Sequence, residues 1–326
     1  MTELPMPRML DAPEMARLLG MRSAVDALHV AFRDAPVPPT PQRLHLTVPV
    51  SDAVTDPEVG PETADLLVMP AAADGWAGTK TVGVVPGNPA RGLPQVTASY
   101  TLLGPPGLVP VAVLDGAALT ALRTAAVSGL ATRLAARRDA HHVVIVGAGV
   151  LARSHILAMD AVLDDISVTV IARDPGAVEP LVADVRSAGC DVPIAAGSQR
   201  SLRAADVICL CTSSPTPVVS LDDLAPGVHV NAVGAHRPDR REVTADAVAA
   251  SRILVGTRDS TLTEKGDLLL AEREEAWHRD AIVGDLHEAA SGAVRVRTAD
   301  EQRTLFASVG HAYEDLVVAC AIVGAG

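Results

Sequence analysis

A glycine-containing turn that follows an apolar run at 143–146 constrains the fold of this chain more than any other feature. Gly147 and Gly149 stand in GxGxxA spacing with Ala152, where a helical pattern begins. In a strand–turn–helix context the first glycine permits a tight turn, the second lets the backbone approach a pyrophosphate, and the small third residue allows close helix packing. The helix N-terminus adds N–H donors and a partial positive charge. The sequence therefore predicts a dinucleotide-binding turn made of Gly147, Gly149, Val150, Leu151 and Ala152.

The segments around this turn alternate between short apolar runs and helical patterns. Strands are predicted at 143–147, 167–171, 206–211, 228–232 and 252–255. Such alternation is typical of a parallel, doubly wound sheet of the Rossmann type, and hence of the α/β class. Past residue 300, the run that begins at Leu305 is predicted as a long helix, which either returns to the first part of the chain or completes the second.

The first third of the chain has a different pattern. Asp11 and Pro13 mark the start of a helix of about 20 residues, which the proline-rich stretch at 35–41 ends. Gly-Pro-Pro-Gly at 104–107 is predicted as a hairpin turn, and a helical pattern resumes at 117–138. Strands are predicted at 43–49, 65–71, 79–85, 95–103 and 108–114. This part is therefore predicted to be a mostly antiparallel sheet with one helix, a second, α+β domain.

Length and composition agree with two folded domains. The 326 residues exceed what one compact core usually holds, and 48% apolar with 20% charged residues excludes intrinsic disorder. A net charge of −12 and only two each of Phe, Trp and Tyr argue against a nucleic-acid partner. We find no basic leader before an apolar run and no stretch of about 18 apolar residues, so no membrane span is expected and a cytoplasmic location is the default.

The cysteines and other metal-binding residue types have no spacing that points to a disulfide, a metal site or a nucleophile. No metal is therefore expected. We predict that all four cysteines are reduced core residues: Cys190, Cys209, Cys211 and Cys320.

The end of the strand that follows the glycine turn bears on the choice of dinucleotide. Ala172 stands where an acid that binds the ribose 2′-hydroxyl is usual in NAD sites, and Arg173 follows it. A small residue beside an arginine accommodates a 2′-phosphate, so NADP is favoured. The alternative is that Arg173 is a solvated loop residue and Asp174 binds the ribose of NAD.

Three cations in the first 123 residues are candidates for an anion site. Lys80 is one of only two lysines, with Lys265, and lies in a predicted strand where burial and nearby positive charge would lower its pKa. Arg123 lies in an apolar helix and needs an anion if it is buried. The alternatives are a solvent-facing Lys80, a structural ion pair for Arg123 and a surface position for Arg43. Together the three could hold a carboxylate.

Short motifs lie along nearly the whole chain. They are Gly-Thr-Lys-Thr-Val with Gly-Asn at 87–88, Val-Leu-Asp-Gly at 113–116, the stretch 119–128, the Gly-Ala-Gly-Val turn, Cys-Thr-Ser-Ser at 211–214, Asn-Ala-Val-Gly-Ala at 231–235, Gly-Asp-Leu at 266–268 and 284–286, and the stretch 305–316. In this order they resemble the ornithine cyclodeaminase and mu-crystallin family. The resemblance implies a homodimer, with 1–120 and 305–326 forming a substrate-binding and dimerisation domain and 121–304 forming an NAD(P)-binding Rossmann domain.

The resemblance also implies roles for individual residues. Arg43, Lys80 and Arg123 would grip a substrate carboxylate, with Lys80 also close to the reacting nitrogen. The cofactor would be lined by Thr212, Ser213, Val233, Ser308, Val309 and Gly310. At this position ornithine cyclodeaminases have a motif similar to Asn-Ala-Val-Gly-Gly-Asp. This chain has Asn-Ala-Val-Gly-Ala followed by His236, a sequence that is more similar to the reductase and mu-crystallin branch.

The expected activity is an NADP-preferring oxidoreductase, with NAD as an alternative cofactor, that reduces a small α-imino acid, such as a cyclic ketimine, or oxidises the matching amino acid. Lys80 would supply a proton as hydride arrives. His236 is a candidate second acid, and the alternative is that it only hydrogen-bonds a loop. Two other functions stay open: ornithine cyclodeaminase, which returns the hydride it removes, and a non-catalytic NADPH-dependent binding protein of the mu-crystallin type.

Overall fold

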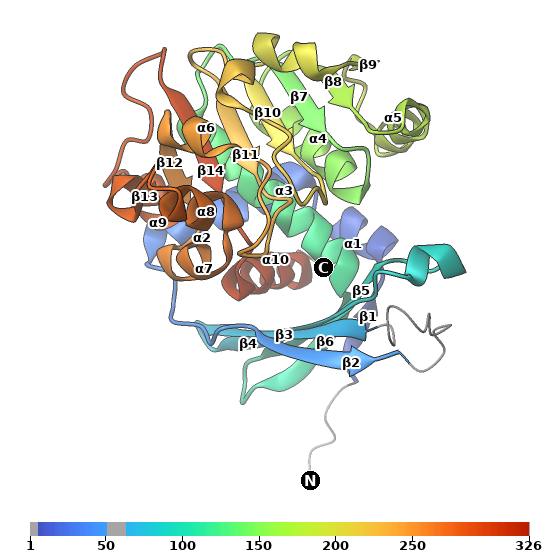
Figure 1. Cartoon of the computed structure of the whole chain (residues 1–326). Helices are drawn as coiled ribbons and strands as arrows, with labels where there is room; N and C mark the ends of the chain where they lie inside the picture. The colour runs from blue at the N-terminus through green and yellow to red at the C-terminus, as the bar shows by residue number, and fades with distance from the viewer. Residues whose placement is uncertain (1–5, 51–62, 326) are drawn as a thin grey trace. The chain divides into compact units, whose positions relative to one another are not determined.

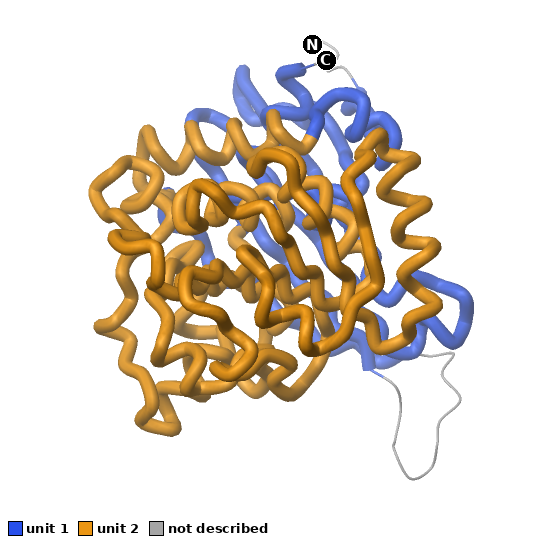
Figure 2. Tube along the Cα trace, turned by 90° about the horizontal axis from the view of Figure 1, so that it is seen from above, with its two compact units in different colours: residues 1–20, 38–123, 312–326 blue, residues 21–37, 124–311 orange. Residues whose placement is uncertain are grey.

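The structure, a computed structural model, describes residues 6–50 and 63–325 as a mixed α/β protein (Figure 1). The chain divides into two compact units (Figure 2): unit 1 comprises 1–20, 38–123 and 312–326, and unit 2 comprises 21–37 and 124–311. The predicted ranges placed 21–37 and 305–311 in the first domain, whereas both belong to unit 2. The first segment carries a helix that packs on other helices of unit 2, and the second contains the last three residues of a central strand of its sheet.

Unit 1 is built on a six-stranded sheet with the order β1-β6-β5-β4-β3-β2. All neighbours in it are antiparallel except β1 and β6. Helix α10 packs against β3, β4 and β5, and α1 contacts β6 and α10. The strands are β1 (Arg8–Leu10), β2 (Leu44–Pro49), β3 (Thr63–Ala73), β4 (Trp76–Val84), β5 (Val96–Gly104) and β6 (Val109–Asp115), and the helices are α1 (Ala12–Leu18) and α10 (Ala312–Gly324). The predicted hairpin turn at 104–107 does connect β5 to β6.

The predicted N-terminal helix is two helices. Asp11 caps α1 as expected: its carboxylate accepts from the Glu14 backbone N–H at 2.9 Å, and Pro13 stands in the first turn. The helix ends because Leu19 is extended and Gly20 follows, and glycine is a weak helix former. A second helix, α2 (Met21–Asp34), then packs on α4 and α9 of unit 2. The prediction of one helix was wrong because the helical periodicity of the apolar residues continues across this break.

Unit 2 contains an eight-stranded, wholly parallel sheet with the order β13-β12-β14-β11-β10-β7-β8-β9. Its strands are β7 (His142–Val146), β8 (Ser167–Ile171), β9 (Ile194–Ala196), β10 (Val207–Leu210), β11 (His229–Ala232), β12 (Ser251–Val255), β13 (Ile282–Asp285) and β14 (Arg303–Ala307). Its further helices are α4 (Val150–Val162), α5 (Val178–Ser187), α6 (Ala245–Ala249), α7 (Arg258–Glu264), α8 (Gly266–Arg273) and α9 (Leu286–Ala290). The predicted Rossmann-type, doubly wound sheet is confirmed.

Separate apolar clusters bury the two faces of this sheet. Successive residues of β7 alternate between them: Val143 and Ile145 pack with α4 and α5, whereas Val144 and Val146 pack with α6 and α8. Both faces are therefore dry, which explains why the strands are continuous apolar runs.

One central strand was predicted as part of a helix. Residues 303–307 form β14, which lies between β11 and β12, and the helix begins only at Ala312. Leu305, Phe306 and Ala307 are fully buried. A strand buried on both faces has no polar positions to reveal its period of two, so the run looks like the start of a buried helix.

Helix α3 (Gly116–Ala135) confirms the predicted helical stretch and carries the chain from unit 1 into unit 2. All four cysteines are free. In the described ranges, the helices lack either the length or the apolar character needed to cross a membrane.

Candidate active site

Four charged side chains form a buried cluster in unit 1. The Lys80 ammonium donates to Asp315 Oδ1 at 2.8 Å and lies 2.7 Å from Oδ2. Arg123 Nε donates to Asp315 Oδ1 at 3.0 Å, and its Nη1 donates to Glu314 Oε2 at 3.0 Å. The exposed fractions of the four residues are at most 6%. Asp315 thus joins the two predicted cations, and two carboxylates balance them.

The fold brings this cluster together from three elements. Lys80 lies in the middle of β4, directly opposite Met69 on β3 and Tyr100 on β5, and these buried residues share the face of the sheet that α10 covers. Glu314 and Asp315 stand in the first turn of α10, where the helix dipole favours negative charge. The solvent-facing alternative for Lys80 is therefore wrong.

Burial and charge set the protonation of the cluster. Burial lowers the pKa of Lys80 to about 8, with Asp315 opposing the shift and Arg123 adding to it. Burial alone would raise the pKa of Asp315, but the charges and hydrogen bonds of Lys80 and Arg123 outweigh it and keep that pKa below its ordinary value. Near neutral pH, Asp315 is therefore ionised, and Lys80 can exchange a proton.

The alternative for Arg123, a buried ion pair, is what the structure contains. Sequence reasoning missed its partners, Glu314 and Asp315, although both lie in a stretch that carried the family resemblance. The available signal was two consecutive acids in an otherwise apolar helix, which need buried cations.

Arg43, the third predicted cation, directly precedes the edge strand β2 and is half-buried. Since Leu44 pairs with Val68, one further step of the register brings Arg43 opposite Met69, the neighbour of Lys80. On the same strand, His45 Nε2 lies 3.1 Å from Asp65 Oδ1. The role of Arg43 in a carboxylate clamp stays a prediction.

The glycine turn of unit 2 has the geometry of a dinucleotide cradle. Gly147 has φ +115°, and a Cβ there would lie 2.5 Å from the Cys211 carbonyl oxygen, so only glycine fits. Gly149 is the N-cap of α4, has no side chain to cap the first N–H groups and faces open space. Val150 is 71% exposed, whereas Ala152 is fully buried in the core. An open helix N-terminus of this kind fits a pyrophosphate.

The other predicted cofactor residues follow neighbouring strands. Arg173 follows β8, Thr212 and Ser213 follow β10, and Val233 follows β11. The segment that follows β14 contains Ser308, Val309 and Gly310. The carboxyl ends of parallel strands meet at one edge of a sheet, so the fold brings these residues to the edge that holds the glycine turn. Their contacts with a cofactor stay predictions.

His236 lies on the same edge, four residues beyond the end of β11, and is exposed. Its Nδ1 lies 3.3 Å from the Gly234 carbonyl oxygen, a contact of the loop-bonding kind. A buried acid, Glu242, lies behind the same loops, and sequence reasoning missed it because Arg-Arg-Glu at 240–242 looks like a solvated charge run.

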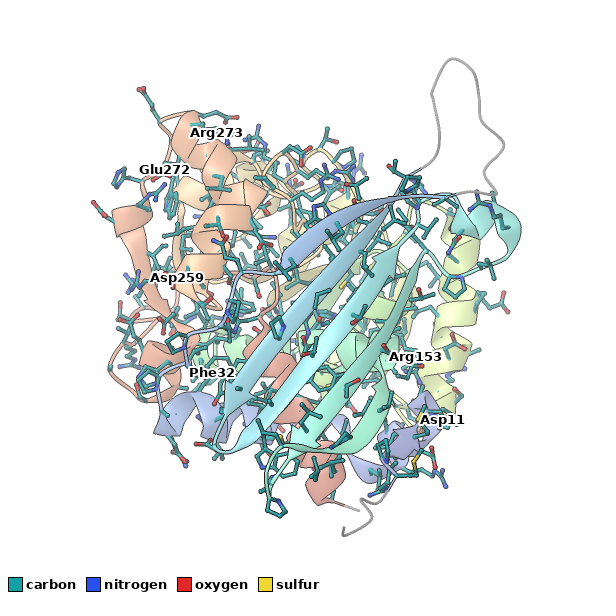
Figure 3. All side chains as sticks on the ribbon, turned by 90° about the horizontal axis from the view of Figure 1, so that it is seen from below. Asp11, Phe32, Arg153, Asp259, Glu272 and Arg273 are labelled. Carbon is teal, nitrogen blue, oxygen red and sulfur yellow. The ribbon has the colours of Figure 1, made fainter. Side chains whose placement is uncertain are left out.

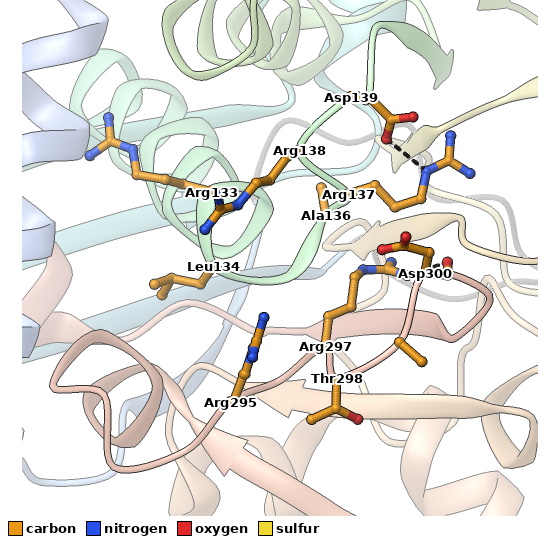
Figure 4. A pocket seen from close by; sticks show the side chains of 11 residues that line it. Arg133, Leu134, Ala136, Arg137, Arg138, Asp139, Arg295, Arg297, Thr298 and Asp300 are labelled. Carbon is orange, nitrogen blue, oxygen red and sulfur yellow. Dashed lines mark hydrogen bonds and ion pairs between the residues drawn. The ribbon is translucent and has the colours of Figure 1, made fainter.

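A hollow at the opposite edge of the sheet is lined by several arginines (Figure 4). Two of them make contacts that serve the fold: Arg297 donates to the carbonyl oxygens of Ala135 at 2.8 Å and Gly227 at 3.0 Å, and Arg137 pairs with Asp139 and Asp206. Arg297 thereby stabilises the C-terminal end of α3, and this hollow lies at the end of the sheet away from the glycine turn. No group of three or more His, Cys, Asp or Glu side chains in the described residues could hold a metal ion.

Comparison with known families decides the relationship. The model of the ornithine cyclodeaminase/mu-crystallin family matches residues 12–324. The chain belongs to this family. The resemblance predicted from the short motifs is therefore confirmed.

Members of the family with known names or structures cover nearly the whole chain. A Δ1-pyrroline-2-carboxylate reductase of Paracoccus denitrificans is 30% identical over 315 residues, which are 96% of this chain and 95% of that protein. The structure of the Thermococcus litoralis Δ1-pyrroline-2-carboxylate reductase in complex with NADH and L-proline has a TM-score of 0.86 at 27% identity and covers 98% of this chain and 97% of that one. An archaeal alanine dehydrogenase dimer with bound NAD has a TM-score of 0.85 at 27% identity and covers 98% and 95%.

Proposed function

We propose that this protein is an NAD(P)H-dependent oxidoreductase that reduces a small, cyclic α-imino acid to the amino acid, or catalyses the reverse reaction. The observation that carries the proposal is the buried Lys80, which can exchange a proton near neutral pH and lies beside Arg123 in a member of this family. Full-length similarity to Δ1-pyrroline-2-carboxylate reductases supports the substrate class.

In this proposal unit 1 binds the substrate. Arg123 and Arg43 hold its carboxylate, and Lys80 donates a proton to the nitrogen of the reduced carbon–nitrogen bond. Asp315 orients the Lys80 ammonium and holds Arg123, so it is a positioning residue. In this proposal Arg43 adds a further positive charge that attracts the carboxylate of an anionic substrate.

Unit 2 binds the cofactor, and the nicotinamide supplies the hydride when bound. The first N–H groups of α4 and the backbone of Gly149 hold the pyrophosphate. Thr212, Ser213, Val233 and the segment Ser308, Val309 and Gly310 line the nicotinamide side. His236 stands on this side as a candidate second acid.

The assay for this function measures stoichiometric oxidation of NADPH or NADH with Δ1-pyrroline-2-carboxylate and Δ1-piperideine-2-carboxylate. Formation of proline or pipecolate with equal loss of reduced cofactor supports the proposal. An ornithine cyclodeaminase would instead form ammonia and proline from ornithine with catalytic NAD. Cofactor binding without turnover of any cyclic imine would favour a binding protein.

We further propose that NADP is the preferred cofactor. Arg173 is exposed at the end of β8, after the small Ala172, and the Asp174 carboxylate accepts from the Gly176 backbone N–H at 2.9 Å. Removing one charge-assisted contact to a 2′-phosphate costs about 1.5–3 kcal/mol, or roughly 10- to 100-fold in KM. Arg173→Ala is therefore expected to raise the KM for NADPH by this factor and to leave that for NADH unchanged.

The control for this substitution is Arg186→Ala, at another exposed arginine of unit 2. Equal KM values of Arg173→Ala and the parent protein for NADPH would contradict the role of Arg173.

We also propose that the protein is a homodimer that associates through unit 1. Leu44, Leu46 and Val48 of β2 are 61%, 55% and 41% exposed and point to the face of the sheet that α10 does not cover, which Figure 3 shows from below. Exposed apolar side chains gathered on one face of a strand are typical of an interaction surface, and the related alanine dehydrogenase is a dimer.

Leu46→Asp tests this interface. The variant is expected to elute as a monomer in size-exclusion chromatography with light scattering, because a buried unpaired carboxylate is costly. Val30→Asp, at an exposed apolar position on α2 of unit 2, is the control and should leave the mass unchanged. An unaltered dimer in Leu46→Asp would place the interface elsewhere.

A further inference from the structure

Glu242 joins the two loops that follow β10 and β11. Its Oε1 accepts from the Thr212 hydroxyl at 2.7 Å and the Thr212 backbone N–H at 3.2 Å. Its Oε2 accepts from the backbone N–H groups of Gly234 at 2.7 Å and Ala235 at 3.0 Å. One fully buried carboxylate therefore satisfies four donors and sets the spacing between the loops.

The loops touch each other at this point. A Cβ on Gly234 would lie 2.2 Å from the Thr212 carbonyl oxygen and 2.4 Å from Glu242 Oε1, so no larger residue fits without moving one of them. The close approach of the two loops therefore depends on glycine at position 234.

The ion pair of Lys265 and Asp267 fixes the backbone of Glu242. Asp267 Oδ1 accepts from the backbone N–H groups of Glu242 at 2.7 Å and Val243 at 2.9 Å. The Lys265 ammonium lies 2.9 Å from Asp267 Oδ2 and donates to the Ala235 carbonyl oxygen at 2.8 Å. Glu242, Asp267, Lys265 and Ala235 thus form a closed ring, and the three charged side chains are fully buried.

This ring accounts for the burial of Lys265, the second of the two lysines in the chain. Two carboxylates and one ammonium leave it one negative charge in excess, which is unfavourable in a dry site unless donors compensate. The four donors from the loops provide that compensation, so Glu242 and the loops depend on each other.

We propose that Glu242 is a positioning residue whose ionised carboxylate holds the loops after β10 and β11 at the spacing that the nicotinamide end of the cofactor requires. This inference rests on the proposed function only in assigning those loops to the cofactor. The Lys265 and Asp267 pair orients Glu242. The hydrogen bonds from Thr212 to Glu242 in turn fix the backbone next to Ser213.

Protonation of Glu242 gives the proposal a pH signature. Burial raises its pKa to about 7, with Lys265 opposing the shift and Asp267 adding to it. The titratable groups that face Glu242 are Lys265 and Asp267 at the start of α8 and the Cys211 thiol at the end of β10, whose own pKa burial raises well above the ordinary value. As the pH falls through about 7, the carboxyl gains a proton and one oxygen ceases to accept.

Glu242→Gln is the test variant, because its amide can accept on one side only and turns N–H donors toward the other loop. The expected result is a rise of about 10-fold or more in the Kd and KM for NADPH, with a smaller change in kcat. In the parent protein the cofactor KM should rise as the pH falls below 7, and this step should be absent in Glu242→Gln. Glu242→Asp keeps the charge but is shorter, so it should retain the pH step at an intermediate KM.

Glu288→Gln is the matched control. Glu288 also accepts a backbone N–H, from Asp285, and pairs with Arg258 in unit 2, but it belongs to α9. The proposal is overturned if Glu242→Gln and Glu288→Gln have the same cofactor KM and the same pH profile.

Hydrogen–deuterium exchange of the parent protein and Glu242→Gln separates this inference from the proposed function. Faster exchange at Thr212, Gly234 and Ala235 in the variant, without cofactor, supports the role of Glu242 in holding the loops, and unchanged exchange contradicts it. A parent protein that neither binds nor oxidises NAD(P)H would overturn the proposed function and the link to the cofactor, whatever the exchange shows.

Discussion

Lys80→Met is expected to lower kcat for imine reduction by about 10³-fold, within the range of 10²–10⁴ that a positioned general acid contributes. Methionine fills similar space, and Asp315 keeps its hydrogen bond from Arg123, so the cluster loses the proposed proton donor without losing all its positive charge. The KM and Kd for NADPH should change little. Stopped-flow and steady-state NADPH oxidation measure the effect.

The pH profile sharpens this prediction. Lys80 must be protonated to act as the acid, and its pKa is lowered to about 8, so the rate of reduction should fall as the pH rises above about 8. Lys80→Met should lose this limb. The control is Thr81→Val, the next residue of β4, whose side chain points to the other face of the sheet. Lys80→Met with parental kcat would exclude Lys80 as the proton donor.

Asp315→Asn is expected to destabilise the protein by about 3–5 kcal/mol, because it leaves Lys80 and Arg123 buried with one carboxylate between them. The amide preserves the size of the side chain, so the expected loss of stability comes from burying the cations without their partner. Chemical denaturation of the variant and the parent protein measures the difference.

The activity of Asp315→Asn provides a second readout. Asp315 raises the pKa of Lys80 against the effect of burial, so its removal should lower that pKa and move the basic limb of the reduction profile below about pH 8. Asp74→Asn, at an exposed turn position of the same unit, should change stability by about 0.5 kcal/mol or less. A variant with parental stability and an unmoved limb would show that Asp315 neither compensates nor orients Lys80.

Part of the candidate site could be predicted because its signals are local. Gly147 is required by a backbone conformation within one turn, and Ala152 by helix packing five residues later. Both requirements act between near neighbours, so they leave a readable spacing. The same holds for Asp11, which caps a helix through a residue three positions away.

The partners of the buried charges could not be predicted in this way. Asp315 is 235 residues from Lys80 and 192 from Arg123. The sequence around each of these residues contains no signal that identifies its partner. Glu242 and Lys265 look like members of ordinary charged runs until the loops after β10 and β11 fold against them.

Local signals in the sequence were enough to predict the doubly wound class of unit 2, the tight turn at Gly147 and the need of Arg123 for an anionic partner. These follow from local conformation and from the cost of burying an unpaired charge. Three further features became visible only in the folded chain: Glu314 and Asp315 pair with Arg123, β14 is a strand inside the sheet, and Glu242 joins two loops. Apolar burial and ion pairing do not depend on separation along the chain, so their partners appear only when distant segments meet.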